Sequence, residues 1–243
     1  MIESPLSMPV IFHLGPVPIT GPVLVTWGIM ALLAGGSWLL TRRLTLRPTG
    51  VQAVLELLVD GITGQIRDTM RSDPMRYLPL IGTLFLFILT ANWSSLVPGI
   101  EPPTAHIETD AALALIVFVA IAWFGIRARG PIGWLASFAE PNLLMVPLNL
   151  VESFTRTFSL LVRLFGNVMS GVFVIGIVLS LAGLLVPVPL MALELLTGAV
   201  QAYIFSVLAM VFIGGAVGAS TPGTRDDQLA MKMNRNSVPM NAR

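Results

Sequence analysis

The sequence predicts an all-α integral membrane protein with about five membrane helices and one amphipathic helix at the membrane surface. Of its 243 residues, 55% are hydrophobic and only 11% are charged, whereas charged residues make up about 25% of an average soluble domain. The apolar residues form long runs, and Lys and Arg lie directly after several of those runs. This distribution is typical of helices that cross a bilayer.

The composition also excludes several classes of function. The chain contains no cysteine and only two histidines, His13 and His106, so it lacks thiolate ligands and has too few imidazoles for a histidine metal cluster. Its net charge of +1 gives no general attraction to nucleic acid. No phosphate-binding glycine loop of the Walker type occurs. We therefore expect no metal, cofactor, nucleotide or nucleic acid on this chain, and no catalytic site.

Residues 22–41 form the first predicted span. They are uncharged and about as long as the roughly 20 residues that a helix needs to cross the hydrocarbon core, and Arg42 and Arg43 end the run. Basic residues after a span mark the cytoplasmic side, which places the N-terminal segment, 1–21, outside. Residues 50–70 repeat apolar residues at helical spacing and keep charged residues on another face, which predicts an interfacial helix.

Two further spans are expected at 77–97 and 111–126. The loop between them, 98–110, is acidic and contains no Lys or Arg, whereas Arg127 and Arg129 follow the second span. Because cytoplasmic loops are enriched in basic residues, the loop is predicted outside and the arginines inside.

The last third predicts a long helical hairpin. Residues 148–183 keep helical periodicity without an internal proline, and at about 1.5 Å per residue they would extend about 54 Å, against a hydrocarbon core of roughly 30 Å. Such a helix must tilt or bend. A second helix is expected at 190–217 after a turn at 186–189, and it returns the polar C-terminal tail, 218–243, to the cytoplasm. The predicted membrane domain thus covers 22–217.

A stripe of polar residues follows one face of the first hairpin helix. Its members recur at intervals of 4, 3, 4, 4 and 3, and a shorter stripe with intervals of 3 and 4 occurs in the second helix. Residues at this spacing share a helix face, so the two stripes can outline a hydrated path or contact a partner. The first stripe consists of Glu152, Arg156, Ser159, Arg163, Asn167 and Ser170, and the second of Glu194, Thr197 and Gln201.

Each stripe also has a purely structural explanation. Glu152 and Arg156 are spaced for an ordinary helical ion pair worth a few tenths of a kcal/mol, and the hydroxyl groups are suited to interhelical hydrogen bonds. Arg163 is harder to explain in this way, because a charge deep in a membrane costs about 2.5 to 3.5 kcal/mol on insertion scales. It either bonds Glu194 or Gln201 across the hairpin or is a functional charge, which is the default for ions inside a membrane.

The segment around this arginine resembles the signature of subunit a of F-type ATP synthases. The string SLLVRLFGN at 159–167 is similar to that signature, and QAYIFS at 201–206 resembles the family's glutamine-bearing segment on the last helix. The resemblance extends to NWSSLVPG at 92–99, to PPT at 102–104 and to the amphipathic segment. It therefore covers nearly the whole chain apart from its ends.

The resemblance implies the stator channel subunit of a rotary enzyme in the bacterial inner membrane. Its partners would be a ring of c subunits, which the long hairpin faces, the b subunits of the peripheral stalk, the remaining ATP synthase subunits and membrane lipid. Arg163 would be the stator charge, a role that suits arginine because it stays protonated at accessible pH. Two half-channels would load and unload protons on ring carboxylates and couple ion flow to rotation and to ATP synthesis or hydrolysis.

By position, the resemblance also assigns ion translocation to further members of the two stripes. Asn167 and Gln201 would line the path near the stator arginine. Glu194 would serve the outer half-channel, and Glu152 and Ser159 would lie along the inner one.

One position departs from the family pattern. Val172, nine residues after the arginine, stands where many relatives carry histidine or an acid. His106, Glu108 and Asp110 of the acidic loop are candidates to replace this relay group, or else ordinary solvated loop residues. The departure leaves sodium open as the coupling ion. Two further hypotheses are a free-standing secondary transporter, for which a repeat pair is expected, and a structural scaffold.

Overall fold

The computed structural model describes residues 10–14, 17–42, 50–97, 100–138, 145–182 and 186–218. Within these ranges, five helices are long and apolar enough to cross a membrane. The predicted all-α membrane fold is therefore confirmed. Most of the polar C-terminal tail and residues 1–9 lie outside the described residues. The helices are α1 (Gly21–Thr41), α2 (Val51–Met70), α3 (Leu78–Trp93), α4 (Ile107–Ser137), α5 (Met145–Ala182) and α6 (Pro187–Val217).

A short antiparallel ribbon precedes α1. It pairs β1 (Val10–Leu14) with β2 (Val17–Thr20), and the helical periodicity of the sequence does not predict it. The following helix starts with Pro22 in its first turn, a position where the missing N–H of proline costs no hydrogen bond.

The same property of proline explains where α6 begins. The residues expected to form a turn at 186–189 instead supply the first helical turn from Pro187 onward, because proline is tolerated at that position. At 38 residues, α5 is about 57 Å long, which agrees with the expected long hairpin helix.

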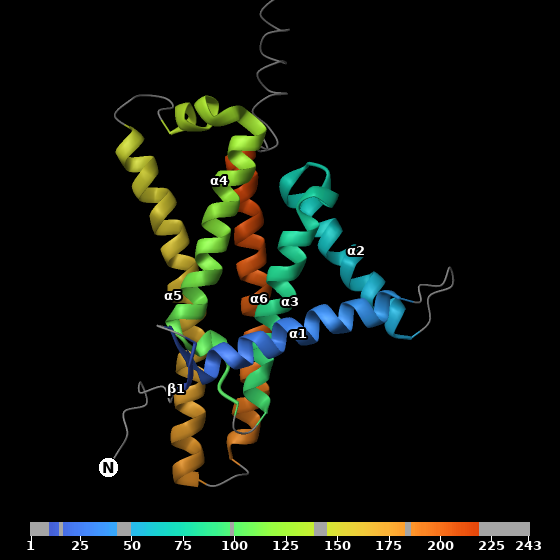
Figure 1. Ribbon diagram of the computed structural model, residues 1–243, viewed down its shortest axis with the longest axis vertical. Helices are drawn as coiled ribbons and strands as arrows, with labels where there is room; N and C mark the ends of the chain where they lie inside the picture. Colours follow the sequence, from blue (N-terminus) through green and yellow to red (C-terminus); the bar gives the residue numbers. More distant parts are fainter. Residues whose placement is uncertain are drawn as a thin grey trace, which may run out of the picture.

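The largest difference from the prediction concerns α4. It begins at Ile107 rather than at 111, so Glu108 and Asp110 lie in its first turn and not in a loop. Acidic residues favour a helix N-terminus because they interact with the positive end of the helix dipole. The helix also continues past 126 to a kink at Gly130, whose φ is 76°, and Figure 1 shows the last segment lying across the end of the bundle. The uncharged run of the sequence therefore predicted a helix that is too short at both ends.

The helices pack around α6. Figure 1 shows α5 and α6 running antiparallel along the long axis with α4 beside them, while α1 crosses at a steep angle. Helix α6 contacts α2, α3, α4 and α5, and it is the most buried of the five candidate spans, whereas α1 and α5 are the least buried. Most of the α5 surface is therefore open to lipid or to a partner.

Candidate functional site

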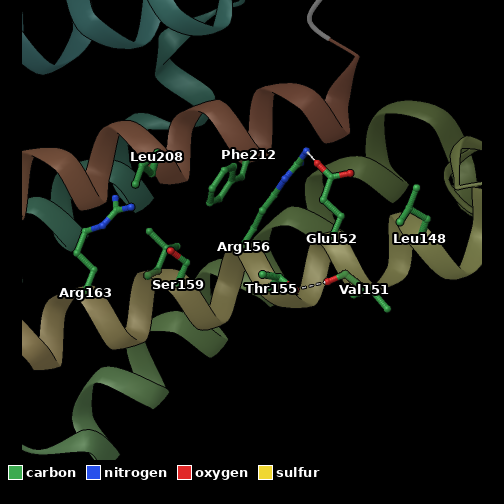
Figure 2. Close-up of a pocket in the computed structure, with 10 residues that line it drawn as sticks. Leu148, Val151, Glu152, Thr155, Arg156, Ser159, Arg163, Leu208 and Phe212 are labelled. Atoms are coloured by element: carbon green, nitrogen blue, oxygen red, sulfur yellow. Dashed lines mark hydrogen bonds and ion pairs between the residues drawn. The ribbon is translucent and has the colours of Figure 1, made fainter.

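The predicted polar stripe of α5 lines an open groove beside α6. Figure 2 shows the Arg163 and Arg156 side chains extending from α5 on the side that faces α6. The groove has a volume of about 550 Å³, and Leu208 and Phe212 supply its α6 wall. From α5 it is lined by Leu148, Val151, Glu152, Thr155, Arg156, Ser159, Leu160 and Arg163. The structure thus brings together four of the six members of the α5 stripe.

Arg163 is exposed, and its guanidinium makes no hydrogen bond or ion pair with any residue that the structure describes. The predicted possibility of a salt bridge to Glu194 across the hairpin is wrong. The Glu194 carboxylate instead lies against Gly171, which is about 12 Å farther along α5 at 1.5 Å per residue. Gln201 is buried within α6 and is not bonded to Arg163 either. Within the described part of the chain, the Arg163 charge therefore has no counter-charge, whereas charges inside a membrane are normally paired or face water.

The ordinary ion pair predicted between Glu152 and Arg156 does form. Both side chains are about half exposed, so the pair contributes little to stability. The Arg156 guanidinium also lies 5.5 Å from the centre of the Phe212 ring, a distance suited to a cation–π contact. This second arginine is therefore paired within its own helix and against α6, unlike Arg163.

A second cavity, of about 430 Å³, lies along the other half of α5. His106 and Glu108 from the start of α4 line it together with Val172. The imidazole Nε2 of His106 is 3.4 Å from the Glu101 carboxylate. The cavity therefore brings two titratable side chains, His106 just before α4 and Glu108 in its first turn, to the same cavity as Val172. The remaining lining residues are Glu101, Ala105, Ile107, Phe165, Met169, Phe173, Gly176, Ile177 and Ser180.

Two carboxylates have buried oxygen atoms that lack a hydrogen-bonding partner among the described side chains and backbone. Both oxygens of Asp110 on α4 and Oε1 of Glu194 on α6 are of this kind. Buried polar groups are normally paired with protein or with ordered water, so each is suited to exchange a proton or to bond water. The expectation that Asp110 is a loop residue is wrong, because it is fully buried in a helix.

Asn167 and Ser170 extend the α5 stripe beyond the groove. The Ser170 hydroxyl donates a hydrogen bond to the Asn167 backbone carbonyl within the same helix, and neither residue lines the groove or the second cavity. Thr197 on α6 likewise donates to the Leu193 carbonyl of its own helix. Both hydroxyl groups thus donate hydrogen bonds within their own helices. The interhelical hydrogen bonds considered for them do not occur among the described residues.

Sequence reasoning missed one polar junction. Asn92, at the end of α3, is buried and donates from Nδ2 to the Gly198 carbonyl of α6 at 2.9 Å. Its Oδ1 accepts from the Thr104 hydroxyl at 2.8 Å. A lone asparagine at the end of an apolar span was the available signal, because such a residue needs a partner inside a membrane.

Comparison of the sequence with known proteins identifies the family of this chain. The sequence model of the family described as ATP synthase A chain matches residues 23–214. The chain belongs to this family. The resemblance to subunit a is thereby confirmed, and the chain is part of the membrane sector of an F-type ATP synthase, a multi-subunit complex that acts in ATP synthesis and ion transport.

Several relatives match most of the chain. ATP synthase subunit a 2 of Bradyrhizobium sp. strain BTAi1 is 59% identical over 223 residues, which cover 92% of this chain and 100% of the relative. ATP synthase subunit a 1 of Chlorobaculum parvum is 51% identical over 80% of this chain and 87% of its own. ATP synthase subunit a of Albidiferax ferrireducens is 46% identical over 86% of this chain and 91% of its own.

Within this family member, Gly171→Ala is expected to displace Glu194. A Cβ at position 171 would lie 2.8 Å from Glu194 Oε1, which is too close for an undisturbed contact. ATP-driven ion pumping per assembled complex should fall about tenfold to a hundredfold, because a misplacement of 1 Å can cost that much.

The matched control is Gly215→Ala on α6, where a Cβ would meet nothing within 4 Å and which lines neither cavity. Shortening the carboxylate with Glu194→Asp in the Gly171→Ala background should recover part of the activity. Equal pumping by both alanine variants would contradict a requirement for close contact at Gly171.

Proposed function

We propose that this chain is the non-catalytic stator subunit that gives ions access to a rotating ring of c subunits. The placement of two cavities along α5 carries the proposal: one extends to Arg163, and the other begins just beyond it. The groove uses α5 residues 148–163 and the second cavity uses α5 residues 165–180. The midpoints of the two segments lie about 25 Å apart along the helix at 1.5 Å per residue. Each cavity would serve one side of the membrane.

The unpartnered Arg163 supports a ring carboxylate as the missing counter-charge. It lies on the exposed surface of α5, one of the least buried spans. Arginine attracts a carboxylate through its planar fork of donors, and it does not relay a proton because it stays charged. The same positive charge would prevent protons from leaking directly between the two routes.

The proposed cycle starts in the second cavity, which serves the outer side. A proton passes the His106 and Glu108 side chains, which line this cavity, and Glu194, and it then neutralises a ring carboxylate. Asp110 is a further candidate for this outer route. A neutral carboxyl can rotate into lipid, where an ionised one would be too costly.

After nearly a full turn, the site meets the inner groove. There Arg163 favours the ionised carboxylate, and the proton leaves past Ser159 and Glu152, which line the groove. Asn167 and Gln201 would line the path near the arginine. A membrane potential of 100 mV contributes about 2.3 kcal/mol for each charge that crosses, and rotation transmits this work to partner subunits that carry the ATP chemistry.

The orientation follows from the distribution of basic residues. In a bacterial inner membrane, the N-terminal segment, 1–21, would lie outside and the tail, 218–243, in the cytoplasm, with 22–217 as the membrane domain and α2 at the interface. The b subunits of the peripheral stalk would be further partners. Sodium in place of the proton is tested by measuring ATP synthesis and hydrolysis with and without sodium at fixed pH. Dependence on sodium would overturn the proton assignment only.

Single cysteines test the two access routes, because the chain contains no cysteine. Ser159→Cys in the groove should react with a membrane-impermeant thiol reagent only from the cytoplasmic side of membrane vesicles. Val172→Cys in the second cavity should react only from the outer side. Phe158→Cys is the control, since Phe158 lines an apolar groove between α4 and α5 next to Ser159 in sequence. Labelling of both reporters from the same side would overturn the two-route proposal.

A further inference from the structure

The asparagine junction at the end of α3 connects three parts of the fold. Asn92 bonds the Gly198 carbonyl on α6 and accepts from Thr104 in the 3-10 turn Pro103–Ala105. The neighbouring Trp93 donates from Nε1 to the Leu195 carbonyl at 3.2 Å. Two adjacent side chains of α3 therefore bond successive turns of α6, while one of them also fixes the segment that leads into α4.

The junction is tightly packed on the α6 side. A Cβ at position 198 would lie 2.9 Å from Cβ of Asn92, so the two helices approach this closely only because Gly198 has no side chain. Asn92 and Thr104 are both buried. Small residues and buried side-chain hydrogen bonds of this kind fix helices against one another inside membranes.

The position of the junction relates it to the outer route. Gly198 lies one helical turn from Glu194 on one side and from Gln201 on the other, and Thr104 lies two residues before His106. We propose that Asn92 is a positioning residue that fixes the α6 segment bearing Glu194 and Gln201 against the segment that carries His106. This inference rests on the proposed outer half-channel, and it adds a residue that neither touches the transported ion nor lines either cavity.

The test uses Asn92→Leu in the complete ATP synthase, with Thr197→Cys as a reporter on the same α6 segment. The labelling rate of the reporter from the outer side should change about threefold to twentyfold, the range expected for loss of an interhelical hydrogen bond in a membrane. Ion pumping per assembled complex should fall, and its dependence on pH should change shape because Glu194 meets different surroundings. A purely structural contact would alter only the amount of assembled complex.

Two further variants keep the test decisive. Thr90→Val is the matched control, because the Thr90 hydroxyl bonds the Leu86 carbonyl of its own helix; it should change neither labelling nor pumping. If Asn92→Leu does not assemble, Thr104→Val removes the loop bond alone and should alter labelling of His106→Cys but not of Thr197→Cys.

Assembled Asn92→Leu or Thr104→Val complexes with unchanged labelling, pumping and pH dependence would overturn the positioning role. Failure of the proposed function would give a different result. In that case Ser159→Cys and Val172→Cys would be labelled from the same side of the membrane even in complexes that retain Asn92.

Discussion

Arg163→Ala is expected to abolish coupled ion transport while the complex still assembles. The exposed guanidinium forms no described intrachain bond, so its loss leaves none of the described buried groups unpaired. Its charge costs about 2.5 to 3.5 kcal/mol to place in a membrane, and an attraction to a ring carboxylate of at least this size corresponds to about a hundredfold or more at 1.4 kcal/mol per factor of ten. ATP-driven pumping in inverted vesicles, normalised to the amount of complex, measures the effect.

The matched control is Arg156→Ala, two helical turns earlier in the same groove. Arg156 is paired with Glu152, so its removal should cost a few tenths of a kcal/mol in stability and much less activity. Arg163→Lys separates charge from geometry, because lysine keeps the charge but loses the planar fork, and it should restore only part of the coupling. Coupled ATP synthesis by an assembled Arg163→Ala complex would support a structural scaffold instead.

Glu194→Gln should produce the second largest effect, a loss of about a hundredfold in the rate of ion transport, which is the lower end of what a positioned proton donor contributes. Glutamine has nearly the same size, so the contact with Gly171 is kept and only the titrating group is lost. The carboxylate is half-buried on α6, and its Oε1 has no described hydrogen-bonding partner. Initial rates of ATP-driven pumping at several pH values would measure the loss.

A carboxylate moved to α5 should compensate for this loss. Val172 follows Gly171, which lies against Glu194, and it lines the second cavity with His106. The double variant Glu194→Gln with Val172→Glu should therefore transport faster than Glu194→Gln alone. Val172→Gln in the same background is the control, since it adds polarity without a titrating group. Normal transport by Glu194→Gln would remove this residue from the route.

The membrane fold was predictable because hydrophobic length is a local property. A helix in lipid must satisfy its own backbone groups, so an apolar run of sufficient length already specifies a span. The same rule was wrong where a helix end carries charge. At the start of α4, Glu108 and Asp110 fit the helix dipole and lie within the helix, although a test for uncharged residues assigned them to a loop.

The candidate site was likewise predictable only in part. Helical spacing was sufficient to place Glu152, Arg156, Ser159 and Arg163 along one groove, because residues three and four apart share a helix face. Spacing within one helix says nothing about which residue of another helix comes near. The contact of Glu194 with Gly171, and the bonds from Asn92 to Gly198 and Thr104, depend on how three separate segments pack.

The sequence by itself determined that this protein is a helical membrane protein with an arginine within an apolar helix, since length, hydropathy and periodicity are set by neighbours along the chain. Only the tertiary structure decided that Arg163 has no described intrachain partner and that α5 lines two separate cavities, one that includes Arg163 and one that begins just beyond it. The physical reason is that a charge is neutralised, and a cavity enclosed, by groups that are close in space and far apart in sequence.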